Sequence, residues 1–134
     1  MANFFKIGTF ATDTHVNIRT LTCQTSGSQR YMTLEYPSGT DYVVPASKTF
    51  IITRVMWSVD TSAAAITFGY ADNGVPDQAG APTNAQKLTE EWRATQNINN
   101  FMDCFIPIPT GKYPFMRAGV GGGICYVTVS GVEV

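Results

Sequence analysis

Charge is scarce in this sequence of 134 residues. Only 14% of the side chains are charged, well below the quarter that is usual for globular domains. The net charge is −1 and lysine and arginine form no cluster, so the electrostatic footprint of a nucleic-acid binder or of a polybasic membrane anchor is missing. We therefore expect neither partner. A surface so poor in charge is explained either by coverage with partner subunits or by a β surface rich in Thr, Ser and Asn.

Long apolar runs and a cysteine framework are also missing. No stretch approaches the ~20 apolar residues of a spanning helix, and the N-terminus has no basic region followed by an apolar core. The three cysteines, Cys23, Cys104 and Cys125, are odd in number and scattered. We therefore expect folding in a cytoplasm, with reduced and mostly buried thiols.

Histidine occurs once, at His15, which excludes a histidine-cluster metal site and leaves a Cys/His nucleophile pair without context. Among the acids, Asp103 stands out because it lies inside an apolar run, and we expect it to face outward or to pair with Arg54 or Arg117. No catalytic residue and no enzymatic activity are expected.

Two weaker site patterns remain. Asp72, Asn73 and Asp77 place oxygen ligands in one stretch, but the distal Glu of an EF-hand is missing, so turn chemistry is the favoured explanation over calcium. Several aromatic residues are candidates either for a sugar-stacking platform or, more in keeping with their alternation, for the core: Tyr36, Trp57, Tyr70, Trp92 and Tyr113. We expect no metal and no cofactor.

Strand patterns, by contrast, are abundant. Residues 42–59 predict a short strand, a proline-marked corner at Pro45–Lys48, and then the longest strand, with apolar side chains on both faces near its start. Such a strand is predicted to lie centrally between two layers. Because Trp57 and Ile66 flank the turn at Asp60, a hairpin is predicted between this strand and residues 64–71.

Eight to ten short strands with no convincing helix predict an all-β fold, an antiparallel jelly-roll β-sandwich of about eight strands. Residues 87–95 fit a helix or a strand, and the all-β context favours a strand. Residues 72–84 are predicted to be a long surface loop. We divide the chain into residues 1–28, an N-terminal arm or first strands, and residues 29–134, the jelly-roll domain.

The N-terminal residues 2–11 are unusually apolar. Phe4, Phe5, Ile7 and Phe10 need a cover, which is either the domain's own core, with this segment as a first strand, or a neighbouring subunit on which it docks as an arm. These four residues, together with Trp92, are the predicted partner-binding residues.

A family resemblance follows from four segments: residues 42–53, 68–72, 108–117 and 126–133. Their strand-and-corner pattern resembles small jelly-roll virion proteins of tailed bacteriophages, the capsid decoration or cement proteins. Such sequences often have Pro-Ala-Gly-Lys at the corner, where this chain has Ser47 in place of the glycine. The resemblance carries no catalytic residues.

The resemblance implies a homotrimer on the capsid exterior that binds the major capsid protein and stabilises the head, with residues 2–11 as the main contact. An alternative is a receptor- or glycan-binding module of a tail appendage, which would use the 72–84 loop and nearby aromatic residues.

Overall fold

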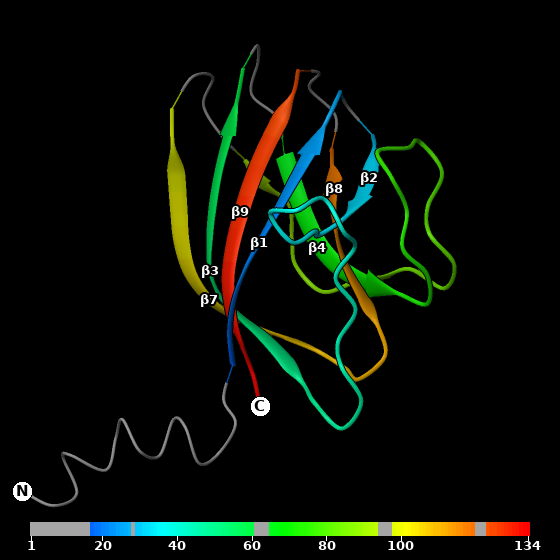
Figure 1. The fold of residues 1–134 in the computed structure, drawn as a ribbon. Helices are drawn as coiled ribbons and strands as arrows, with labels where there is room; N and C mark the ends of the chain where they lie inside the picture. The colour runs from blue at the N-terminus through cyan, green and yellow to red at the C-terminus, as the bar shows by residue number, and fades with distance from the viewer. Residues whose placement is uncertain (1–16, 28, 61–64, 94–97, 120–122) are drawn as a thin grey trace, which may run out of the picture.

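The computed structural model describes residues 17–27, 29–60, 65–93, 98–119 and 123–134 (Figure 1). In these ranges the chain forms nine β-strands and no helix. The strands are β1 (Asn17–Thr25), β2 (Tyr31–Thr33), β3 (Phe50–Val59), β4 (Ala65–Ala71), β5 (Gln86–Lys87), β6 (Trp92–Arg93), β7 (Asn100–Ile108), β8 (Tyr113–Ala118) and β9 (Cys125–Glu133).

The strands form two antiparallel sheets that pack face to face (Figure 1). Sheet 1 has the order β1-β9-β3-β7, and sheet 2 has the order β2-β8-β4-β5, with β6 also paired to β4. The chain alternates between the sheets, except that β4, β5 and β6 share one. With β5 and β6 counted as one broken strand, these orders are the two interlocked Greek keys of a jelly roll, so the predicted fold class is confirmed.

Strand β3 lies in the centre of sheet 1, between β9 and β7, as predicted, but the prediction that it lies between two layers is wrong, because its outer face is exposed. The apolar residues on both faces near its start therefore have a different explanation. A β-bulge at Thr53 shifts the register, so the inward side chains are Phe50 and Ile52 before the bulge and Val55 and Trp57 after it. The core phase therefore changes within one strand, and the outer face stays exposed at Arg54 and Met56.

The predicted hairpin between β3 and β4 is wrong. Strand β3 ends at Val59 in sheet 1, and β4 begins at Ala65 in sheet 2, so the connection crosses between layers. Both neighbour positions of β3 are already taken by β7 and β9. A short polar connection fits either path, and only the rest of the sheet decides between them.

The strand predicted before the corner is also wrong. Tyr42 and Val44 are buried, but they lie outside the strands, and Val44 exchanges backbone hydrogen bonds with the β7–β8 turn at Lys112 and Gly111. The corner itself is present: Lys48 N donates to Pro45 O at 3.2 Å, and Ser47 has φ of +60°. Glycine adopts this left-handed conformation without strain, so the residue at which the chain departs from the family pattern occupies a glycine-type position.

One continuous core fills the space between the sheets. Its largest fully buried aromatic side chains are Tyr42, Phe50 and Phe68. Gly131 of β9 makes room for Phe50, because a Cβ atom there would lie 2.6 Å from the Phe50 ring and 2.5 Å from the Ile51 carbonyl oxygen. Strand β1 is part of this structure, since it pairs with β9 along its whole length. The division at residues 28 and 29 stays a prediction.

Candidate functional site

The partner-binding residues predicted from the sequence fall into two groups. Phe4, Phe5, Ile7 and Phe10 lie outside the described residues. Trp92 lies on β6, half-buried, where its ring centre is 5.7 Å from that of Trp57 and 5.6 Å from that of Phe68. Its ring thus joins the two sheets at the core margin and offers only part of its surface outward. Its role in partner binding stays a prediction.

The acid singled out by the sequence, Asp103, faces outward and pairs with Arg54, one of the two partners predicted for it. Arg54 Nε donates to Asp103 Oδ1 at 2.7 Å, and both side chains are exposed. The hydrogen bond from Arg54 lowers the pKa of Asp103 below its usual value. A carboxylate held ionised on an open surface is suited to charge pairing with a partner and unsuited to proton transfer near neutral pH.

The oxygen atoms considered as calcium ligands close their own loop. Asp72 accepts from Lys112 and Asn84, Asn73 Oδ1 accepts from the Thr83 amide at 2.6 Å, and Asp77 binds Arg30. In the part of the chain that the structure describes, no group of three or more His, Cys, Asp and Glu side chains is placed to hold a metal ion. In the described structure these oxygen atoms accept hydrogen bonds from other residues of the chain, which fits turn chemistry.

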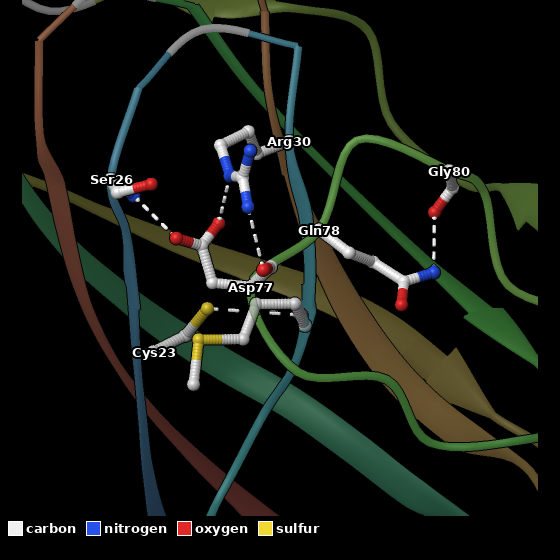
Figure 2. A network of polar contacts seen from close by, with 7 residues as sticks. Cys23, Ser26, Arg30, Asp77, Gln78 and Gly80 are labelled. Carbon is white, nitrogen blue, oxygen red and sulfur yellow. Dashed lines mark hydrogen bonds and ion pairs between the residues drawn. The ribbon is translucent and has the colours of Figure 1, made fainter.

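Asp77 fixes this loop to the sandwich (Figure 2). Its Oδ1 accepts from Arg30 Nε at 2.6 Å, its Oδ2 accepts from the Ser26 amide at 2.9 Å, and Arg30 Nη2 donates to its backbone oxygen at 2.7 Å. Beside it, Gln78 and Tyr31 exchange backbone hydrogen bonds of 3.0 and 2.7 Å. The loop residues 75–78 therefore cover the outer edge of β2.

A second polar cluster lies at one end of the sandwich, around Glu133 of β9. Glu133 is 1% exposed and accepts from Arg19 Nε at 2.7 Å and from the Tyr42 hydroxyl at 2.9 Å. Burial alone raises the pKa of this carboxyl, but the hydrogen bonds from Arg19 and Tyr42 outweigh it and leave the pKa below its usual value. The cluster is fully paired and closes the core, so it is structural.

The thiols are poor nucleophiles. Cys23 and Cys125 are buried, Cys104 is half-buried, and burial raises the pKa of all three. At neutral pH a thiol with a raised pKa carries little of the reactive thiolate.

The most unusual surface is the outer face of sheet 1. Five large apolar side chains that point away from the core are exposed there. Ile18 (76%) lies on the edge strand β1, and the other four lie on β3, β7 and β9: Met56 (46%), Phe101 (69%), Phe105 (72%) and Tyr126 (43%). We call these four residues the outer-face patch. The Arg54–Asp103 ion pair lies among them, and the Arg54 guanidinium is 5.8 Å from the centre of the Phe101 ring. An exposed apolar patch on a sheet face is typical of a surface that a partner covers.

A groove of about 780 Å³ lies along part of this face. It runs over β1, β9 and β3 to the start of β7, and its lining includes Gln24, Thr128, Met56, Phe101 and Tyr126. Three members of the outer-face patch thus line one depression that is mixed in polarity. Such a surface can take an extended or irregular protein segment.

The sequence did not single out this patch. Phe101 and Phe105 belong to the apolar run at residues 101–109, which is interrupted only by Asp103. The signal that could have identified them is their spacing around Asp103: three residues on the same strand face, of which the middle one carries a charge, cannot all enter a core.

No protein-family model matches the chain, and no curated protein matches it. The chain is similar to a chain in the structure of infectious bursal disease virus Gx strain, with a TM-score of 0.48 and 14% identity over 89% of this chain and 32% of that one. It is also similar to a chain in the structure of the Gt strain, with a TM-score of 0.39 and 10% identity over 88% of this chain and 37% of that one. For a chain in the crystal structure of the T13 IBDV viral particle, the TM-score is 0.39 and the identity is 10% over 88% of this chain and 35% of that one. This chain therefore spans about a third of the length of those chains.

The described residues include no helix able to cross a membrane.

Proposed function

We propose that this chain is a structural protein of a virus particle, a trimeric capsid decoration protein that binds the major capsid protein on the exterior of a tailed-phage head. The observation that carries the proposal is the outer-face patch, four exposed apolar side chains on one sheet of a jelly-roll sandwich. Viral capsid domains are one of the uses of the jelly roll, and an exposed apolar patch is typical of a protein–protein interaction site.

The resemblance of residues 42–53, 68–72, 108–117 and 126–133 to capsid decoration proteins supports the same function. The low share of charged residues fits a surface that is partly covered in an assembly, because the cores of protein interfaces are depleted in charge. The groove with Met56 and Tyr126 is the surface that we assign to the capsid contact.

The number of copies per particle tests this function. Quantitative mass spectrometry of purified particles of the virus that encodes the chain should find it in a fixed ratio to the major capsid protein, on the order of hundreds of copies. A few copies per particle would indicate an appendage instead, and none would overturn the proposal.

The contact surface needs a separate test. In this test the purified chain is added to particles that lack it, and the number of copies bound is measured. The double variant Met56→Ser with Tyr126→Ser is expected to bind at least about tenfold less than the wild type, since each change removes exposed apolar contact area. Leu88→Ser is the matched control, because Leu88 has a similar exposure of 40% but follows β5 of sheet 2. Equal binding of both variants would remove the groove from the contact. Deleting Ala2–Phe10 tests the arm in the same assay, and unchanged occupancy would remove these residues from the capsid contact.

A further inference from the structure

The four sheet edges of the sandwich are protected to different degrees. At the β1 edge, the amide of Thr22 donates to Glu35 O at 2.8 Å, and the amide of Glu35 donates back at 2.9 Å. The β2 edge is covered by loop residues 75–78, and β5 and β6 have only two residues each. Strand β7 has nine residues, and no described segment pairs with its outer side. A long open edge is the position at which another strand adds to a sheet.

The side chains of β7 specify what that strand must supply. On the outer face, Phe101 and Phe105 flank Asp103. On the inner face, Met102 is 39% exposed and Cys104 is half-buried, so the core is incompletely closed along this edge. A fitting strand therefore needs apolar residues toward the core and an aromatic residue toward the outer face, where a cation could share the exposed Asp103 carboxylate with Arg54.

The chain contains a segment with this pattern. In an extended conformation, Phe4 and Lys6 would share one face and Phe5 and Ile7 the other. We propose that residues Phe4–Ile7 of a neighbouring copy add to β7 as an antiparallel strand, with Lys6 opposite Asp103. In this register Phe4 lies opposite Phe105, Phe5 opposite Cys104, and Ile7 opposite Met102, so both faces are complementary.

The donor is a second copy because the same chain cannot reach. Asn17 lies at the Ile108 end of sheet 1, since Asn17, Glu133, Phe50 and Ile108 form one row across the sheet. In the antiparallel register Phe10 lies beyond Asn100, at the other end, which is about 35 Å away across the strands. The chain between Phe10 and Asn17 spans at most about 25 Å. The same chain could add only a parallel strand, in a sheet whose described pairs are all antiparallel.

A disulfide test uses the native Cys104. The full chain with Phe5→Cys, purified and oxidised with diamide, is expected to give a product of two or more linked chains on a non-reducing gel. Adding Cys104→Ser should abolish this product, which excludes the buried Cys23 and Cys125 as partners. Lys6→Cys is the matched control, because the neighbouring residue faces away from Cys104 in this register. A link within one chain, equal linkage by Lys6→Cys, or no linkage would overturn the proposal.

Association of the unmodified chain gives an independent readout. Light scattering after size-exclusion chromatography should show an oligomer of the wild-type chain. Lys6→Glu and Phe105→Ser should each raise the concentration needed for association about tenfold or more. Lys87→Glu and Ile18→Ser are the controls, since Lys87 is exposed on sheet 2 and Ile18 is 76% exposed on the opposite edge of sheet 1. A monomeric wild-type chain, or equal effects of variants and controls, would contradict the proposal. The test uses the free chain, so its outcome does not depend on capsid binding.

Discussion

Ser47 shows how one residue can carry a strain that its sequence neighbours do not reveal. Its φ of +60° is unfavourable for a side chain with a Cβ atom, and the side chain is exposed. Ser47→Gly is therefore expected to raise the free energy of unfolding by about 0.5–1 kcal/mol, measured by urea denaturation. Ser38→Gly, at an exposed turn residue without a positive φ, should instead be neutral or destabilising. A loss of stability in Ser47→Gly would show that the serine side chain has a role of its own.

Glu133 makes the stability depend on pH. Because the pKa of Glu133 is lower in the folded state than in the unfolded chain, its ionised form stabilises the fold. This stabilisation is complete above the unfolded-state pKa of about 4.3 and is lost as the pH falls through the lower folded-state value. Glu133→Gln is expected to cost about 2–4 kcal/mol at pH 7 and progressively less below about pH 4, in thermal melts from pH 7 to pH 3.

Two further variants complete this test. Tyr42→Phe removes one hydrogen bond to Glu133 and keeps the ring, so it should cost about 1–2 kcal/mol and remain folded. Glu90→Gln replaces an exposed carboxylate and should change little at pH 7. A gap between the wild type and Glu133→Gln that stays constant down to pH 3 would contradict the assignment.

For single residues, the sequence predicted that Asp103 faces outward but did not predict that Glu133 is buried, and both outcomes have one physical reason. A charge inside an apolar run has few options, and facing outward follows from the cost of burial. The Glu133 carboxylate is in phase with the core residues of β9, and its burial is tolerable only because Arg19 reaches it from β1. That partner lies 114 residues away, so only the strand pairing reveals it.

Among the elements, the loop at residues 72–85 is fixed by contacts that can be removed one at a time. Asp77→Asn weakens the interactions with Arg30 and Ser26. We expect it to lower the free energy of local opening of this loop by about 1–2 kcal/mol. Amide exchange of Tyr31 and Gln78 should then be roughly tenfold faster, with little change in β9.

The same loop offers its own control. Asp72 also forms an ion pair, with Lys112, but both side chains are more than a third exposed, so Asp72→Asn should have a smaller effect. If both variants accelerate exchange at Tyr31 and Gln78 equally, the fixing role does not belong to Asp77.

The strands themselves were largely predictable, and their partners were not. The longest predicted strand and the strand predicted at residues 64–71 correspond closely to β3 (Phe50–Val59) and β4 (Ala65–Ala71). The bulge at Thr53 was not visible, since a change of phase in the sequence resembles a strand with two apolar faces. The false hairpin at Asp60 has a similar origin, because a turn sequence does not show in which sheet the next strand lies.

For the whole molecule, composition predicted that part of the surface is unusual but not where it lies. The apolar run at residues 101–109 is consistent with a strand covered on both faces. In the described structure, however, the outer face of β7 is exposed. Sequence cannot tell whether an apolar face is covered by the same chain or by another molecule. In the described structure the outer-face patch lies on one sheet only, and its side chains are exposed.

The long open edge at β7 also bears on how many neighbours each copy could have in an assembly. A chain that offers one acceptor edge and donates one N-terminal strand has a valence of two, with unlike ends. Head-to-tail contacts of this kind either close into a ring or continue without limit as a filament. A ring of three would satisfy every edge at the smallest size compatible with a local threefold axis. The angle at which each strand leaves its own sandwich would then decide between a finite particle component and an open polymer.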